Sequence, residues 1–303
     1  MPSTREIRRR ISSAKNISQI TRAMEMVAAS RMKRAQQAVL AGRPYAEKIA
    51  DVIENLAARV EGTDQAEIHP LLRTRPIKNA AVIMFTADKG LAGALNTNVI
   101  RRTTRFILDE AGVPVSMIVV GRKGRDFMIR YGRPLIAEFT GMKDRPSITD
   151  IYPVARVATE EYLSGRVDAV YLIYTDYVNT LIQKPTVYRL LPVDISHIGE
   201  EGALPGHNLE RVSEKTAVEY IFEPSVNEVL TQLVPRYIEV RMFQALLEHI
   251  ASEQSARMVA MRNATQSAKD MITDLTLAYN KLRQANITRE IIEVSSGAAA
   301  QAG

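Results

Sequence analysis

Two long stretches at opposite ends of the chain carry the apolar spacing of a helical seam. In residues 1–58, apolar or small side chains recur every three or four positions. They are Ile7, Ile11, Ala14, Ile17, Thr21, Met24, Ala28, Ala35 and Ala38. Ser3 or Thr4 is a suitable N-cap, and the next helix-breaking residues are Gly42 and Pro44. The spacing predicts one N-terminal helix of roughly 80 Å, which needs a long partner.

The second stretch lies near the C-terminus, where residues 236–295 contain neither proline nor glycine. Its seam is formed by Phe243, Leu247, Ile250, Gln254, Met258, Met261, Ala264, Ala268, Ile272, Leu275, Tyr279 and Leu282. The pattern predicts a helix over 224–296, with a kink near Pro235 and a short tail at 297–303. Two long helices at opposite chain ends most simply pair as an antiparallel coiled coil. Two separate long helices are the alternative.

The intervening residues alternate between short apolar runs and helical patterns. Strands are predicted at 80–86, 115–120, 135–140, 169–176 and 183–191, with a further one possible at 218–222. Helices are predicted at 92–110, 124–131 and 149–164. After a linker at 59–77, residues 78–223 therefore form an α/β globular domain with a largely parallel sheet. The fold class is α/β, a Rossmann-like three-layer domain inserted between the two coiled-coil helices.

The amino-acid composition excludes several kinds of functional site. The 303 residues include no cysteine, which excludes disulfides, thiolate nucleophiles and thiol redox control. The four histidines lie far apart in the sequence, so no metal site is expected, and no cofactor motif is complete. No apolar run is long enough to span a bilayer.

Positive charge is concentrated at the N-terminus. Residues 1–48 hold eleven basic and three acidic side chains, a net charge of +8, whereas the whole chain carries +6. A solvated face, an acidic protein partner and nucleic acid are all compatible with this charge. Residues 1–44 contain no aromatic side chain that could stack on a base, which argues against nucleic acid.

Two glycine-containing loops follow predicted strands. The first, Thr86–Gly93, and the second, Gly121–Gly124, could each present amide groups to a phosphate, but neither completes a nucleotide-binding motif. A structural strand-to-helix turn is the simpler interpretation of both. The carboxylates of the domain are isolated in sequence, so we expect no catalytic residues. A nucleotide-binding enzyme using residues 88–93 and a coiled-coil nucleic-acid binder remain as alternatives.

The two chain ends resemble the gamma subunits of F-type ATP synthases. At the N-terminus the resemblance rests on IRRRI at 7–11 and NISQITRAMEMVAASRM at 16–32. At the C-terminus it rests on ASEQSARMVAM at 251–261, ITREIIE at 287–293 and SGA at 296–298. A Thr-Asp-Lys-Gly-Leu element typical of the family is also present at 86–91, with Ala87 inserted. The resemblance covers the whole chain from its first helix, which favours a bacterial origin.

The resemblance implies a non-catalytic rotor shaft that couples proton flow through the membrane Fo sector to ATP synthesis or hydrolysis. The implied partners are the alpha3beta3 hexamer of F1, the epsilon subunit and the c-ring, with one copy of this chain per complex at the cytoplasmic face of the bacterial plasma membrane. No nucleic acid is implied. Contacts with a beta subunit are implied for Met24, Arg31, Lys33, Arg34, Arg283, Gln284, Thr288 and Glu290. Tyr220 and Glu223 match the foot segment that faces the c-ring.

Overall fold

The structure, a computed structural model, describes residues 3–59, 69–193, 223 and 226–302. The chain divides into two compact units. The first contains residues 1–28 and 258–303, and the second contains residues 29–257. Both long helices contribute to both units, because α1 spans Thr4–Arg59 and α6 spans Val226–Ala302.

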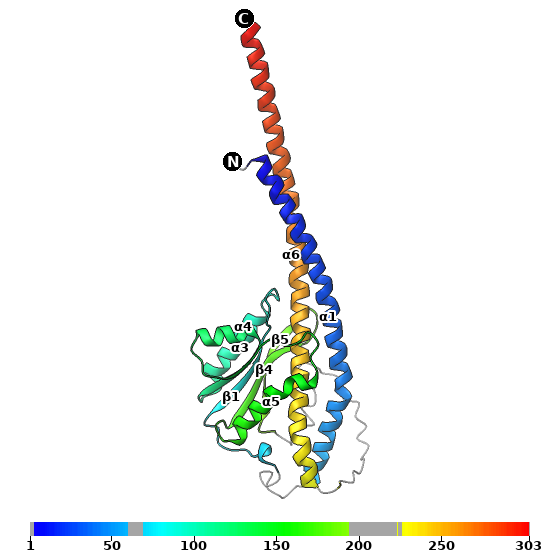
Figure 1. Cartoon of the computed structure of the whole chain (residues 1–303), viewed down its shortest axis with the longest axis vertical. Helices are drawn as coiled ribbons and strands as arrows, with labels where there is room; N and C mark the ends of the chain where they lie inside the picture. Colours follow the sequence, from blue (N-terminus) through cyan, green and yellow to red (C-terminus); the bar gives the residue numbers. More distant parts are fainter. Residues whose placement is uncertain (1–2, 60–68, 194–222, 224–225, 303) are drawn as a thin grey trace. The chain divides into compact units, whose positions relative to one another are not determined.

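The first unit is an antiparallel pair formed by the start of α1 and the end of α6 (Figure 1). Buried α1 side chains repeat every seven residues at Ile7, Ala14, Thr21 and Ala28. On α6 the same repeat joins Met261 to Ala268, as expected for a coiled-coil seam. Thr21 and Thr265 meet inside this seam, with their hydroxyl oxygens 2.7 Å apart. The predicted antiparallel coiled coil is confirmed.

The seam differs from the prediction at two positions of α1. Ile17 is 53% exposed, and Ala38 is also exposed. A strict seven-residue repeat from Ile7 and Ile11 passes through Ser18, which is half-buried, so Ile17 points away from the partner helix. Apolar character alone misassigned the face of this turn.

The C-terminal helix is longer than its sequence indicates. It runs unbroken through Pro235 and continues past Gly297 to Ala302, so the tail predicted at 297–303 is helical up to that residue. Val234, Tyr237 and Ile238 are buried around the proline, and this packing offsets the hydrogen bond that the proline removes. The segment before Pro235 is accordingly part of the same helix.

The second unit is built around a five-stranded sheet in the order β3-β2-β1-β4-β5. The strands are β1 (Ala80–Phe85), β2 (Val115–Val120), β3 (Leu135–Phe139), β4 (Ala169–Tyr177) and β5 (Gln183–Leu191). The first four are parallel and β5 is antiparallel to β4. Its helices are α3 (Leu95–Arg105), which ends in a π-helical turn at Phe106–Glu110, α4 (Arg122–Arg130) and α5 (Ile148–Leu163). The strand possible at 218–222 lies outside the described residues.

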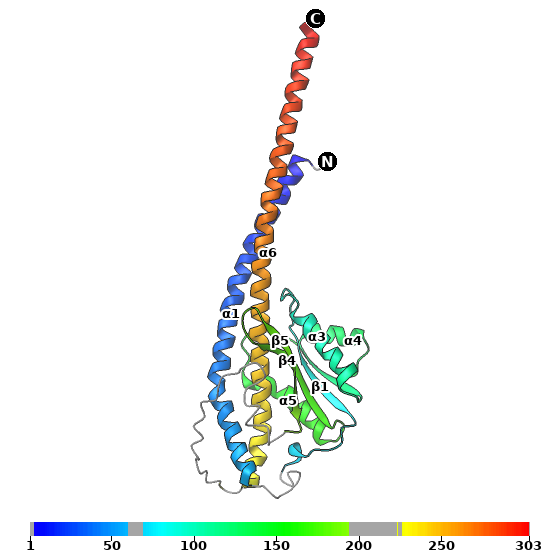
Figure 2. The same cartoon turned by 180° about the vertical axis from the view of Figure 1, so that it is seen from behind.

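Each face of the sheet has its own hydrophobic core, since successive β1 side chains alternate between faces. Ala81, Ile83 and Phe85 pack with α5 and with parts of α1 and α6. Ala80, Val82 and Met84 pack with residues of α3 and α4. Figures 1 and 2 show α3 and α4 on one side of the sheet and α5 on the other. The three-layer α/β architecture is thus as predicted.

Part of the predicted linker belongs to this core. Residues Pro70–Leu72 form a short 3-10 helix, and Leu71 and Leu72 are almost completely buried. His69 precedes it, and its Nδ1 atom accepts a hydrogen bond from the Leu71 N–H at 3.1 Å. The two leucines therefore attach this segment to the sheet by burial of apolar surface.

Candidate functional site

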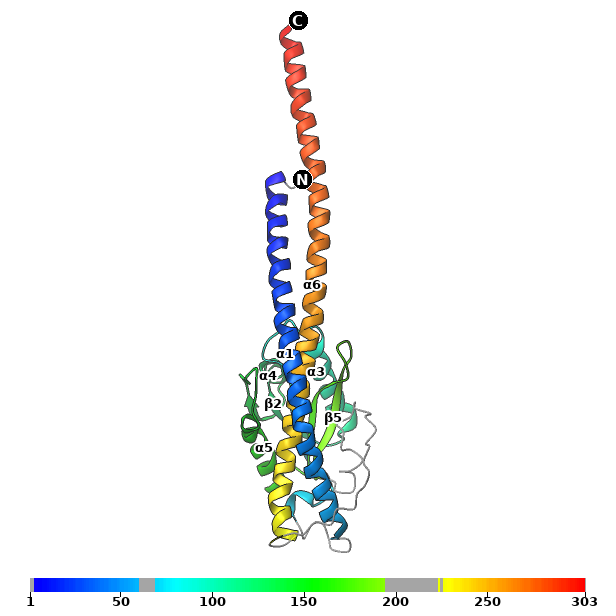
Figure 3. The same ribbon diagram turned by 90° about the vertical axis from the view of Figure 1, so that its right-hand side faces the viewer.

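The C-terminal end of α6 extends beyond its helical partner in the first unit (Figure 3). Arg8 donates to the Tyr279 hydroxyl at 2.7 Å, so the first turns of α1 lie opposite residues near 279. With α1 beginning at Thr4, residues from about 284 to Ala302 have no α1 segment beside them. The four predicted contact residues Arg283, Gln284, Thr288 and Glu290 are all exposed there.

Exposed apolar residues that are not among the predicted contacts accompany them. Ile287, Ile291 and Val294 recur at four and three residues, which places them on one helix face. Val294 is 74% exposed. The spacing of the stripe can be read from the sequence, but its place beyond the start of α1 follows only from the register of the two helices. A bare apolar stripe of this kind is typical of a surface that another protein covers.

The predicted N-terminal contact residues fall in both units. Met24 is half-buried in the first unit, and its neighbour Glu25 accepts from Arg262 Nε at 2.8 Å. In the second unit Lys33 and Arg34 are exposed, whereas Arg31 forms a two-point ion pair with Asp144, with both N–O distances 2.9 Å. Arg31 is therefore engaged by the loop after β3, and Lys33 and Arg34 are the more accessible cations.

The two predicted foot residues are only partly covered by the structure. Glu223 is exposed. Tyr220 lies outside the described residues.

The loop after β1 is held by hydrogen bonds within the chain. Asp88 accepts through one carboxylate oxygen from the Arg122 N–H (2.9 Å) and through the other from the Gly141 N–H (2.8 Å). Thr86 Oγ1 accepts from the Gly124 N–H at 2.9 Å. The amide donors at the start of α4 are thus used by side chains of this chain, whereas a phosphate site would leave them open to a ligand. The structural interpretation of both glycine loops is supported.

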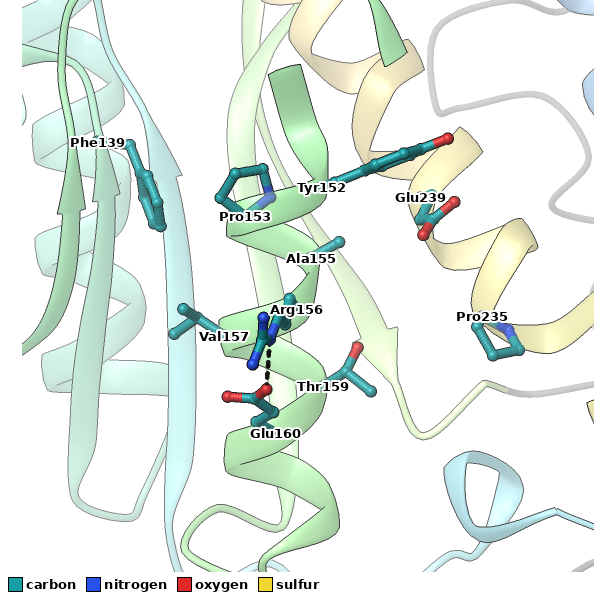
Figure 4. Close-up of a pocket in the computed structure, with 10 residues that line it drawn as sticks. All are labelled: Phe139, Tyr152, Pro153, Ala155, Arg156, Val157, Thr159, Glu160, Pro235 and Glu239. Carbon is teal, nitrogen blue, oxygen red and sulfur yellow. Dashed lines mark hydrogen bonds and ion pairs between the residues drawn. The ribbon is translucent and has the colours of Figure 1, made fainter. Parts of the chain in front are cut away.

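An open groove of about 730 Å³ lies between α5 and the beginning of α6 (Figure 4). Its charged side chains are already paired, with Arg156 Nε donating to Glu160 at 2.6 Å. Beside it, Arg236 bonds the hydroxyls of Tyr45 and Tyr152 and the carboxylate of Glu239. These bonds tie α1, α5 and α6 together. Among the described residues that line the groove, no acid, base and nucleophile are hydrogen-bonded to one another.

Two carboxyl groups meet between β4 and α6. Asp176 and Glu248 are both buried, and β5 places Lys184 near them. Burial raises the pKa of Asp176 to about 6, against the opposing effects of a hydrogen bond with Glu248 and the charge of Lys184. Next to Glu248, burial lowers the pKa of His249 to about 4, so this imidazole is neutral at pH 7. Burial therefore favours the protonated form of Asp176.

Replacing Asp176 with asparagine is expected to flatten the pH dependence of unfolding. The pKa of this carboxyl is about 6 in the folded chain and near the ordinary 3.8 when unfolded. The protonated Asp176 carboxyl stabilises the fold fully below pH 3.8, the unfolded pKa. This stabilisation is lost as the pH rises through about 6, the folded pKa. The loss amounts to about 2 to 3 kcal/mol between pH 4 and pH 7. Urea unfolding of the full chain at several pH values measures it, with the exposed Asp109→Asn as control. Equal pH slopes in the two variants would contradict the assignment.

None of the helices in the described part of the chain combines the length and apolar character that a membrane crossing requires.

Comparison with known proteins agrees with these features. The family model for ATP synthase, ATP-synt, matches residues 3–301. The ATP synthase gamma chain of Roseiflexus castenholzii is 53% identical over 100% of this chain and 99% of its own length. That of Dehalococcoides mccartyi strain 195 is 48% identical over the full length of both.

Solved structures show the same fold. A chain of the Tetrahymena thermophila mitochondrial ATP synthase central stalk and c-ring is 25% identical, with a TM-score of 0.58, over 81% of this chain and 99% of that one. A chain of the Euglena gracilis mitochondrial OSCP/F1/c-ring structure has a TM-score of 0.64 at 22% identity, covering 98% and 94%.

Two long helices that pair as an antiparallel coiled coil, with a five-stranded α/β layer inserted between them in the sequence, define the class of ATP synthase central-stalk chains. The matches extend across both helices and the inserted layer. The chain belongs to the ATP synthase gamma-chain family.

Proposed function

We propose that this chain is the rotor shaft that couples proton flow through the membrane Fo sector to ATP synthesis or hydrolysis in F1. One copy contacts the alpha3beta3 hexamer, the epsilon subunit and the c-ring. The observation that carries the proposal is the bare end of α6, where exposed polar residues adjoin the apolar stripe of Ile287, Ile291 and Val294. A helix end of this composition is typical of a surface that another protein covers.

The proposed coupling mechanism follows from the asymmetric surface of the α6 end. A helix with one apolar stripe cannot present the same face to three equivalent beta subunits at once. Each beta subunit then meets different side chains, and differential contact biases its conformation. Turning the helix moves each set of contacts to the next subunit, so the shaft shifts the equilibria of catalytic sites that it does not contain.

The contact residues take separate roles in this proposal. Arg283, Gln284, Thr288 and Glu290 make polar contacts with a beta subunit from the bare end of α6. Met24 lies against a beta subunit, and the exposed Lys33 and Arg34 attract its acidic segment. Arg31 contributes through its ion pair with Asp144, which positions α1 on the α/β layer. Glu223 and Tyr220 face the c-ring.

The domain roles follow the same division. Residues 1–58 and 224–296 serve as the shaft, residues 78–223 as the globular base, residues 59–77 as the linker and residues 297–303 as the terminal segment. We place the complex at the cytoplasmic face of a bacterial plasma membrane, where this chain associates with the membrane through its partners.

Reconstitution tests the function directly. The chain is mixed with separately purified alpha and beta subunits of a relative and analysed by gel filtration and ATPase assay. We expect one copy to join three of each and to produce cooperative ATP hydrolysis. A chain that stays apart and leaves the activity unchanged would overturn the proposal.

Replacing Met24 with lysine is expected to impair coupling more than assembly. Met24 is half-buried, so the new ammonium group must either lose hydration or displace a neighbouring surface. We expect ATP-driven proton pumping per ATP hydrolysed to fall several-fold in membrane vesicles. Met26→Lys is the matched control, because Met26 is 62% exposed and can keep its charge in water. Failure of assembly before any loss of coupling would contradict the contact assignment.

A further inference from the structure

The crevice at the carboxyl ends of β1 and β4 is occupied by α6. The chain leaves β1 toward β2 on one side, whereas β4 lies on the other side, so this is the position where open α/β sheets change direction. Such crevices commonly receive a ligand. Here His249 of α6 lies beside Phe85 at the end of β1, with ring centroids 6.3 Å apart. The position that other α/β domains use for a small molecule holds a helix of the same chain.

Directional hydrogen bonds hold α6 in this crevice. The register between β1 and β4 ends at Met84 and Ile173, so β4 runs on without β1 beside it. Beyond that point both backbone groups of Thr175 bond to α6. Its N–H donates to His249 Nδ1 at 3.4 Å, and its carbonyl accepts from Ser252 Oγ at 3.1 Å. Side chains of α6 thereby form hydrogen bonds with the backbone of β4, in the part of β4 that extends beyond its pairing with β1.

Two more bonds extend the contact over the following turn of α6. Ser255 Oγ donates to the Thr180 carbonyl in the turn between β4 and β5 at 2.8 Å. Arg257 donates to the Gly90 carbonyl in the loop after β1 at 3.2 Å, and Glu253 holds its guanidinium at 2.6 Å. We call His249, Ser252, Ser255 and Arg257 the α6 anchor. All four side chains are buried or nearly so.

The place of the anchor along the chain is also informative. The second unit ends at Arg257 on α6 and begins at Ala29 on α1. The anchor therefore binds α6 in the last turns before it leaves this unit. On α1 the ion pair of Arg31 with Asp144 occupies the corresponding position, just after the helix enters. That pair is partly exposed and contributes less than buried bonds do.

We infer that the α6 anchor transmits torque, because it fixes the rotation of α6 about its own axis and its position along that axis relative to the α/β layer. Apolar packing is non-directional, whereas hydrogen bonds weaken steeply when their geometry changes. Four bonds to three separate segments therefore resist twisting of the helix in a way that packing alone does not. This inference rests on the proposed rotor function, and the anchor residues are positioning residues in it.

The test uses the complete ATP synthase with the double variant Ser252→Ala and Ser255→Ala. ATP hydrolysis by detached F1 measures turnover without load. The number of protons pumped per ATP, measured against a rising opposing proton gradient, reports how well hydrolysis stays coupled to pumping under load. We expect hydrolysis near the wild-type rate and pumping per ATP at least threefold lower at the highest gradient. Ser267→Ala, an exposed α6 serine outside the anchor, should match the wild type.

The outcomes separate the possible failures. A wild-type complex that hydrolyses ATP without pumping overturns the proposed function itself. A coupled wild type with an equally coupled double variant overturns the anchor alone. Should the double variant fail to assemble, Ser255→Ala alone decides, compared with Ser255→Thr, which retains the hydroxyl group. Lower proton pumping per ATP in the alanine variant, with wild-type pumping in the threonine variant, supports the anchor. Equal pumping per ATP in both variants overturns it.

Discussion

Replacing Gly121 with alanine is expected to prevent the α/β layer from folding stably. Gly121 has a φ of +102°, which an L-residue with a side chain rarely adopts. A Cβ atom here would lie 1.9 Å from the Thr86 carbonyl oxygen and 2.7 Å from Thr86 Oγ1. The first atom belongs to the backbone just after β1, and it cannot move without disturbing that central strand. We expect destabilisation of about 4 kcal/mol or more, visible as loss of soluble protein or a strongly lowered Tm.

Gly132→Ala is the matched control for this prediction. Gly132 also has a positive φ, +62°, but a Cβ atom there would meet nothing within 4 Å. The control therefore carries the backbone strain without the collision, at a cost of about 1 kcal/mol. Thermal unfolding of both full-length variants separates the two effects. Similar losses in Tm would show that the contact between Gly121 and Thr86 is unimportant.

The sequence predicted the main elements well because burial is regular in them. The core strand β1 reads Ala-Ala-Val-Ile-Met-Phe, an uninterrupted apolar run, since both of its faces are covered. The coiled-coil seam was readable for the same reason. Ile17 was wrongly assigned to the seam. It lies three positions after Ala14 and Ser18 lies four positions after it, so either spacing fits the same helix face, and the half-buried residue is Ser18. Only the partner helix distinguishes the two.

Features that depend on contacts between distant parts of the chain could not be predicted from the sequence. Asp88 could not be recognised as a structural carboxylate, because its amide partners Arg122 and Gly141 lie 34 and 53 residues further along the chain. Leu71 and Leu72 sit in a proline-bounded segment that reads as a linker, and only the sheet beside them makes them core. The α6 anchor was hidden likewise, since Ser252 and Ser255 resemble ordinary helix residues until Thr175 and Thr180 are placed beside them.

The predicted contact residues show a similar division. Family motifs supplied Met24 and the α6 positions 283, 284, 288 and 290, which composition alone would not have selected. Their exposure or half-burial is compatible with contacts to another subunit. The apolar stripe of Ile287, Ile291 and Val294 required the length of α1 for its recognition, because the same residues would form an ordinary seam beside a longer partner.

Replacing Leu275 with proline is expected to uncouple ATP hydrolysis from proton pumping. Leu275 is half-buried in the seam of the first unit, opposite the stretch of α1 around residue 12, as the bonds of Tyr279 and Thr265 define the register. Proline removes one helical hydrogen bond and collides with the preceding turn, at a cost of about 3 kcal/mol or more. Pro235 is tolerated because buried neighbours enclose it, whereas Leu277, two residues beyond Leu275, is 56% exposed. Bending here would displace the bare end of α6 from the beta subunits that we propose it contacts.

Membrane vesicles that contain the variant complex provide the measurement. We expect ATP hydrolysis to continue while proton pumping falls at least tenfold, because the catalytic sites remain intact and the shaft no longer turns as one body. Leu275→Ala is the control, since alanine shortens the seam side chain but preserves the helix, and its pumping should stay within about twofold of the wild type. Intact pumping in the proline variant would mean that rotation is transmitted without a continuous α6, and the shaft mechanism would then be wrong.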